Sequence, residues 1–158
     1  MSASMKRCAF LLLAIAMVLT GCAKSFDVKT APGFVEVKEP DAAYDFRAVA
    51  PDGVAVAVRA VKIDDKTDLA FWESAVMLRT REMDGYAKVS ASDVKSADGT
   101  PGREIVFGHD EQGKPYVYRV RIFVRGSKLV LAEAGGSAEN MDRWKSGVES
   151  MLASVSVN

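Results

Sequence analysis

The feature that most limits the fold is a series of apolar segments in the second half of the chain, joined by short turns. Residues 103–109, 116–125 and 128–134 are predicted as strands, and turns are predicted at 97–102 (ADGTPG), 110–115 (DEQGKP) and Gly126-Ser127. Strands joined by such short connections pair antiparallel, because a parallel pair needs a long crossover. The second half of the chain therefore predicts an antiparallel meander, and the weaker alternation of residues 86–96 predicts its edge strand.

The first half predicts two more strands in a hairpin, a short strand before them, and a helix after them. Residues 34–37 form the short strand, and residues 44–48 and 54–63 flank the turn Pro51-Asp52-Gly53. Acidic residues at 64–68 supply helix caps, and Gly85 ends the helix. Its apolar stripe is predicted from Leu69, Trp72, Val76 and Met83, widened by Phe71, Ala75 and Leu78.

A second helix is predicted from Ser137 to the end of the chain. Its buried face is marked at helical spacing by Met141, Trp144, Val148, Met151 and Leu152. The resulting fold class is α+β, with an antiparallel sheet of about six or seven strands flanked by two main helices.

This order of elements resembles the PsbP-like fold, a group that includes PsbP, Mog and DcrB. The resemblance covers residues 34–157 and depends on three stretches: the hairpin around Tyr44-Asp45-Phe46-Arg47 and 54–63, the meander 102–107 and 116–120, and the strand 128–132 that leads into the Trp144 helix. It implies a PsbP-like sandwich with a non-enzymatic binding or assembly role beside a membrane or a larger complex. It implies no catalytic residues.

The N-terminus has the three zones of a signal peptide. Lys6 and Arg7 are basic, residues 9–19 are uninterrupted apolar sequence, and Leu19-Thr20-Gly21-Cys22 follows. The apolar run is shorter than the roughly 20 residues that span a bilayer. The last four residues resemble the lipobox of bacterial lipoproteins, which implies cleavage before Cys22, a lipid on its sulfur and an acylated terminus, for instance with palmitate.

Two alternatives to the lipobox are a signal peptide with an incidental cysteine and an uncleaved anchor. On the lipoprotein interpretation, residues 1–21 are the signal peptide, 22–33 the lipidated N-terminus and tether, and 34–158 one α+β domain. The domain is then expected in the periplasm, lipid-anchored to a membrane of the cell envelope. The sequence does not decide which membrane carries it.

Residue counts exclude several kinds of chemistry. Cys8 leaves with the signal peptide and Cys22 is modified, so no free thiol is expected. With His109 as the sole histidine, a zinc site of cysteines and histidines is not expected, and a hydrolase would need His109 as its base without a Gly-x-Ser-x-Gly elbow. Loss of Lys6 and Arg7 leaves 19 basic against 21 acidic residues, which disfavours nucleic-acid binding. We therefore expect no enzyme activity, no metal and no cofactor.

The strand 116–125 offers one candidate interaction face. Its two-residue period places Arg119, Arg121, Phe123 and Arg125 together, where they bind acidic headgroups, a carboxylate or a partner protein, or instead pair across strands with Glu104 and Glu133.

Trp72 and Trp144 offer a second candidate, either as core residues or as walls of a ligand pocket between helix and sheet. The functional hypothesis is an accessory or assembly lipoprotein that contacts the membrane through the lipid on Cys22 and binds an envelope protein. The alternative is a carrier or sensor of a small apolar or anionic ligand.

Overall fold

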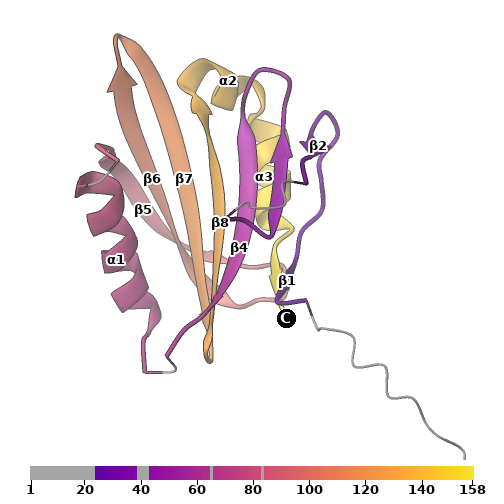
Figure 1. Ribbon diagram of the computed structural model, residues 1–158, viewed down its shortest axis with the longest axis vertical. Helices are drawn as coiled ribbons and strands as arrows, with labels where there is room; N and C mark the ends of the chain where they lie inside the picture. Colours follow the sequence, from indigo (N-terminus) through magenta and orange to yellow (C-terminus); the bar gives the residue numbers. More distant parts are fainter. Residues whose placement is uncertain (1–23, 39–42, 65, 83) are drawn as a thin grey trace, which may run out of the picture.

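The computed structural model describes residues 24–38, 43–64, 66–82 and 84–158, and its centre is a seven-stranded antiparallel sheet (Figure 1). The strand order is β2-β3-β4-β8-β7-β6-β5, so the edge strand predicted at residues 86–96 is confirmed as β5. The α+β class with its antiparallel sheet is confirmed as well. The sheet strands are β2 (Val35–Glu36), β3 (Phe46–Val49), β4 (Ala55–Lys62), β5 (Ala87–Lys95), β6 (Pro101–Glu111), β7 (Lys114–Arg125) and β8 (Lys128–Ser137).

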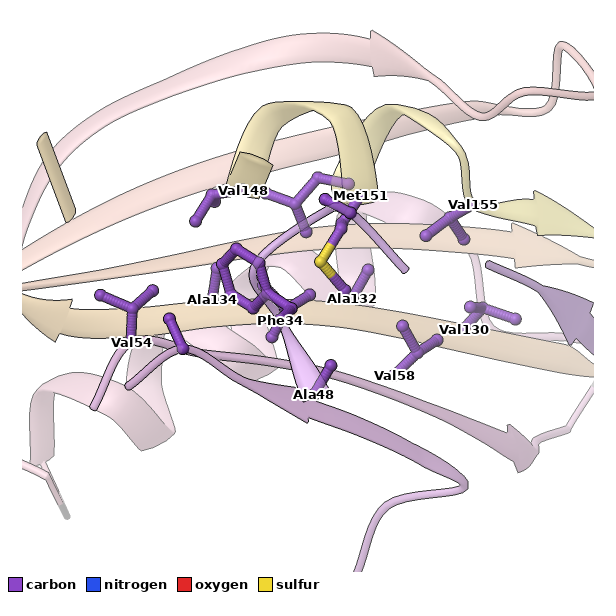
Figure 2. Close-up of a cluster of buried hydrophobic side chains, with 14 of the residues drawn as sticks. Phe34, Ala48, Val54, Val58, Val130, Ala132, Ala134, Val148, Met151 and Val155 are labelled. Atoms are coloured by element: carbon purple, nitrogen blue, oxygen red, sulfur yellow. The ribbon is translucent and has the colours of Figure 1, made fainter. Parts of the chain in front are cut away.

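Two layers of helix cover the two faces of the sheet. On one face lie α2 (Ala138–Arg143) and α3 (Lys145–Ala153), over a core that includes Phe34, Val58 and Met151 (Figure 2). On the other face lies α1 (Leu69–Glu82), over a smaller core that includes Ile105 and Phe107. Alternate side chains of each long strand enter these two cores, because successive strand residues point to opposite faces.

The first helix begins as predicted but buries a narrower stripe. The Asp68 carboxylate accepts a hydrogen bond from the Phe71 amide at 2.9 Å, which caps the helix start. Leu69, Trp72 and Val76 pack on the sheet, whereas Phe71 and Leu78 are 53% and 57% exposed. The wider stripe was therefore wrong for Phe71 and Leu78, because at about 100° per residue they lie roughly 130–150° around the helix from the centre of the line that contacts the sheet.

The C-terminal segment forms two short helices, where one was predicted. Ser137 caps α2 as expected, since its hydroxyl accepts a hydrogen bond from the Asn140 amide at 3.3 Å. The helical path is interrupted at Trp144, whose indole Nε1 donates to Asp52 Oδ1 at 2.8 Å. That bond links the helix junction to the β3–β4 turn.

The predicted tether is folded onto the domain over the part that the structure describes. β1 (Phe26–Asp27) pairs antiparallel with β9 (Ser156–Val157), and the Asn158 amide donates to the Ser25 carbonyl at 3.1 Å. Ala31 is buried in the α3-side core. The tether prediction is wrong for residues 24–33, because these residues contribute apolar side chains and backbone pairing to the fold. Cys22 and the lipobox lie outside the described residues.

Among the described residues, no helix is long and apolar enough to span a bilayer.

Candidate functional site

The face of the sheet that carries α1 is only partly covered by it. The helix packs mainly against β5, β6 and β7, at one side of the sheet (Figure 1). Beside it, two cavities of about 420 and 400 Å³ share Tyr44, Tyr118 and Glu133 as lining residues. We call these adjoining cavities the Glu133 hollow. Small side chains line its floor, namely Ala55, Ala57 and Gly135.

Strand register brings the polar residues of the hollow together. Glu133 on β8 lies directly opposite Ala57 on β4 and Val120 on β7. Arg59 and Tyr118 are each displaced by two residues from those positions, on the same face of the sheet. Diagonal neighbours of this kind are within reach of long and aromatic side chains. The sheet geometry therefore directs both side chains at the Glu133 carboxylate.

Glu133 is a carboxylate held inside the protein with one oxygen unused. Glu133 as a whole is 5% exposed to solvent. The Tyr118 hydroxyl donates to Oε1 at 2.6 Å, and Arg59 Nη2 donates to the same oxygen at 3.4 Å. Among the residues that the structure describes, Glu133 Oε2 and Arg59 Nε are buried without a hydrogen-bond partner. Buried polar atoms in folded proteins are nearly always hydrogen-bonded, so this pair of atoms is unusual.

The two tyrosines beside the carboxylate stay protonated. Burial raises the pKa of Tyr118 far above its ordinary value, and the negative charge of Glu133 raises it further. Burial, the same charge and the closeness of the Glu133 carboxylate as a hydrogen-bond acceptor also raise the pKa of Tyr44. The Arg59 guanidinium lies 5.5 Å from the centre of the Tyr44 ring. The hollow therefore offers one unused carboxylate oxygen and one unused guanidinium donor beside the Tyr44 ring.

At the Glu133–Arg59 pair, this arrangement favours an uncharged polar group as the occupant. Other parts of the hollow are lined by Arg47, Arg79 and Asp84. A cation placed at Glu133 would meet the Arg59 guanidinium, and an anion would meet the Glu133 carboxylate. A group that both donates and accepts a hydrogen bond satisfies Glu133 Oε2 and Arg59 Nε without adding charge. The cost of leaving such atoms unpaired in a buried site is about 1–3 kcal/mol each.

The arginines of the predicted interaction face are mostly engaged inside the protein. Arg119 bonds Glu104 and Glu149 at 2.8 Å each, and Arg121 Nε bonds Glu104 at 2.6 Å. Arg121 is 6% exposed. The alternative of cross-strand pairing with Glu104 is therefore confirmed. Pairing with Glu133 was wrong, because that residue lies on the opposite face of the sheet.

The rest of the predicted face does not form one exposed surface. Phe123 is fully buried in the α3-side core. Arg125 is exposed at the end of β7 and bonds Asp98 at 3.2 Å. The four residues share a face as the period predicted, but α3 and its carboxylate Glu149 cover the middle of it.

The two tryptophans do not share a pocket, because they lie on opposite faces of the sheet. Trp72 packs into the α1-side core and Trp144 against the α3-side core. Each indole nitrogen has a partner within the domain, Thr67 for Trp72 and Asp52 for Trp144. Packing is the role that these contacts support.

His109 lies at the rim of the α1-side core. Its Nδ1 is 3.1 Å from the Gly85 carbonyl, and its ring centre is 5.0 Å from that of Tyr86. Within the described ranges, no three metal-binding side chains of His, Cys, Asp or Glu converge.

Sequence reasoning missed the Glu133 hollow, although one signal was present. Residues 129–134 (LVLAEA) carry one carboxylate in an otherwise apolar strand. A charged residue in such a strand is costly to bury unless it is paired, so it marks a position of interest. Which face of the strand it occupies, and that α1 leaves this part of the face open, depend on the three-dimensional arrangement.

The chain has no match among protein-family models or curated protein sequences. It is similar in structure to LpqN of Mycobacterium tuberculosis, a protein involved in cell envelope biogenesis, with a TM-score of 0.68, 12% identity, and coverage of 84% of this chain and 83% of that one. It is also similar to the cyanobacterial PsbP (CyanoP) of Synechocystis, with a TM-score of 0.57, 15% identity, and coverage of 87% and 96%. A third similar structure is PA94 of Pseudomonas aeruginosa, a protein of unknown function and putative regulator, with a TM-score of 0.51, 8% identity, and coverage of 85% and 83%. The PsbP-like fold expected from the sequence is therefore confirmed.

Proposed function

We propose that this chain is a lipid-anchored protein of the bacterial cell envelope with a non-enzymatic binding role, and that the Glu133 hollow is its binding site. The observation that carries the proposal is the buried Glu133 carboxylate, which has one oxygen without a partner among the described residues and lies in a hollow bounded on one side by α1. The lipobox at Leu19-Thr20-Gly21-Cys22 supports the anchor. The involvement of LpqN in cell envelope biogenesis supports an envelope role on the same fold.

Binding fits the hollow better than catalysis because its carboxylate is ion-paired with Arg59 and its tyrosine hydroxyls are not activated. Tyr118 and Arg59 both donate to Glu133, and the tyrosine hydroxyls stay protonated. A general base or nucleophile needs a free carboxylate or an activated hydroxyl at working pH. The residues described around the hollow supply recognition instead, through hydrogen bonds and aromatic surface.

Two kinds of occupant are consistent with this role. In an accessory or assembly protein, a partner inserts an uncharged polar side chain or a backbone amide beside Glu133. In a carrier or sensor, a small molecule fills the hollow, and the cavity volume of about 420 Å³ is within the range of ordinary ligand pockets.

Site-specific photocrosslinking in living cells separates these occupants. Tyr44 is 36% exposed at the rim, so Tyr44→p-benzoylphenylalanine replaces one aromatic ring with a photoreactive one. We expect either a discrete protein adduct, which indicates the accessory role, or an added small-molecule mass, which indicates the carrier role. The matched control is Val89→p-benzoylphenylalanine, on the exposed edge strand β5. Equal adducts at both positions, or none at either, would contradict the proposal.

A further inference from the structure

Three basic residues form a row across neighbouring strands at one end of the sheet. Arg125 on β7 lies opposite Lys128 on β8, and Lys128 lies opposite Lys62 on β4. All three belong to the face that carries α3, since they continue the alternation of Phe123, Val130 and Val58. We call them the basic row. Like charges directly opposite each other in a sheet are destabilising, so the row is an unfavourable feature for the folded domain by itself.

Contacts within the chain satisfy only part of the row. Arg125 bonds Asp98 and the Val157 carbonyl, and Lys128 bonds the Asn158 carbonyl. Both Arg125 and Lys62 remain exposed to solvent. An external anion placed against the row would offset the repulsion between neighbouring cations.

The row lies at the end of the domain where the N-terminal segment joins the fold. Ser25 is hydrogen-bonded to Asn158, next to the partner of Lys128. The turn at Ser127 also bonds Ile63 at 2.9 Å, directly after Lys62. Figure 1 shows β1, the C-terminus and the β7–β8 turn at this same end. We call it the anchor end.

Covalent geometry places the lipid close to this end. Cys22 precedes Ser25 by three residues, and an extended chain spans at most about 3.6 Å per residue, so the lipidated sulfur is attached roughly 11 Å or less along the backbone from Ser25. Because β1 and β9 pair immediately after Ser25, the domain has no long tether on which to move away from the membrane.

We infer that the basic row contacts the phosphate groups of lipid headgroups, so that the domain stands with its anchor end on the membrane. This inference rests on the lipid anchor of the proposed function. Juxtamembrane lysines and arginines are attracted to an anionic lipid surface, with an interaction that falls off within a Debye length. In this orientation the Glu133 hollow, midway along β8, opens sideways above the lipid surface.

The two tryptophans provide a test because they lie toward opposite ends of the domain. Trp72 bonds Thr67 in the β4–α1 connection at the anchor end, and Trp144 bonds Asp52 in the β3–β4 turn at the other end. The lipidated protein is reconstituted into vesicles of phosphatidylethanolamine and phosphatidylglycerol that contain headgroup spin-labelled lipid. Trp144→Phe leaves Trp72 as the fluorophore, and Trp72→Phe leaves Trp144. We expect severalfold stronger quenching of Trp72.

A charge-reversal pair tests the role of the row itself. Lys62→Glu places a carboxylate opposite Lys128, a favourable cross-strand pair that preserves folding, and we expect it to weaken the quenching of Trp72. Lys145→Glu, at the exposed start of α3 beside Trp144, changes the net charge equally at the far end and should leave the quenching of Trp72 unchanged. Equal quenching of both tryptophans, or equal effects of both substitutions, in protein that floats with the vesicles would overturn the inference alone. Failure of the wild-type protein to float with them would instead overturn the proposed anchor.

Discussion

At the scale of single residues, Glu133 is the position on which the hollow depends. Its side chain accepts from Tyr118 and Arg59, and both partners are largely removed from solvent. We expect Glu133→Ala to lower the free energy of unfolding by about 3–5 kcal/mol, because it leaves a partly buried guanidinium without its carboxylate. Urea denaturation followed by circular dichroism measures this change.

Tyr118→Phe is the matched control for that substitution. It removes one hydrogen bond to a charged group but keeps the ring and the Arg59–Glu133 ion pair, so we expect a loss of about 1.5–3 kcal/mol. A loss for Tyr118→Phe as large as that for Glu133→Ala would contradict the central role of the carboxylate.

Asp98 is a second residue whose charge contributes to the fold. The hydrogen bond from the Ser96 hydroxyl, followed by that from the Val157 amide, lowers the pKa of Asp98 far below its ordinary value. A carboxyl group with a depressed folded pKa stabilises the protein above its unfolded pKa of about 4, and this contribution is lost as the pH falls below that value.

We therefore expect the wild-type protein to lose stability between pH 7 and about pH 3. Asp98→Asn cannot titrate, so it should start from a lower stability at pH 7 and lose less on acidification. Urea denaturation of both proteins at the two pH values tests this. Parallel losses in the two proteins would show that the acid sensitivity arises from other carboxylates.

At the scale of elements, the attachment of α3 depends on a cluster of two arginines and two glutamates. Glu104 on β6 bonds both Arg119 and Arg121, whereas Glu149 on α3 reaches the same arginines from a side chain that is 48% exposed. We expect Glu104→Ala to cost about 3 kcal/mol, because it leaves the buried Arg121 with only one carboxylate. Glu149→Ala should cost about 1 kcal/mol or less, as for exposed ion pairs.

Thermal or urea unfolding of the two variants orders these costs, and hydrogen exchange of α3 amides locates the effect. If Glu149→Ala proved the more damaging change, the helix would depend on this bridge more than on the apolar contacts of Val148, Met151 and Leu152.

The type and order of the helices and strands could be predicted from sequence periodicity, whereas the contacts between them could not. The alternation along residues 116–125 correctly separated Val120 and Ile122 from Arg121 and Phe123, because strand side chains alternate in every sheet. The same pattern does not tell which face of the strand a helix covers, so the burial of Phe123 beneath α3 could not be derived from it.

Long-range backbone pairing was also beyond the sequence. The segment 26–27 is too short, and its neighbours are too polar, for a strand to be predicted there. It pairs with residues 156–157, far away in the sequence. The interruption at Trp144 similarly depends on Asp52, a distant turn residue. Glu133 was visible as an isolated carboxylate, and the turn at Gly126-Ser127 already placed the strand of Tyr118 beside it, but its partner Arg59 comes from β4, which only the sheet order makes adjacent to β8.

At the scale of the whole molecule, the lipid and the fold should be separable. Cys22 precedes the first described residue, Lys24, and the domain closes on itself through β1 and β9. Two or three acyl chains anchor a protein firmly, since each buried methylene contributes about 0.8 kcal/mol. We therefore expect Cys22→Ser to move the protein out of the membrane fraction without changing the unfolding of the domain.

Fractionation of cells that express each form tests the first half of this prediction, and mass spectrometry of the wild-type N-terminal peptide should show the added lipid on Cys22. Thermal unfolding of the released Cys22→Ser protein tests the second half, with the lipidated wild type in detergent as the control. A Cys22→Ser protein that lacks residues 1–21 and still stays in the membrane fraction would contradict the lipid anchor, whereas retention with residues 1–21 attached would show that cleavage needs Cys22. A released but unfolded protein would show instead that the membrane contact at the anchor end contributes to folding, since β1 and β9 would then be insufficient to hold the N-terminal segment on the sheet.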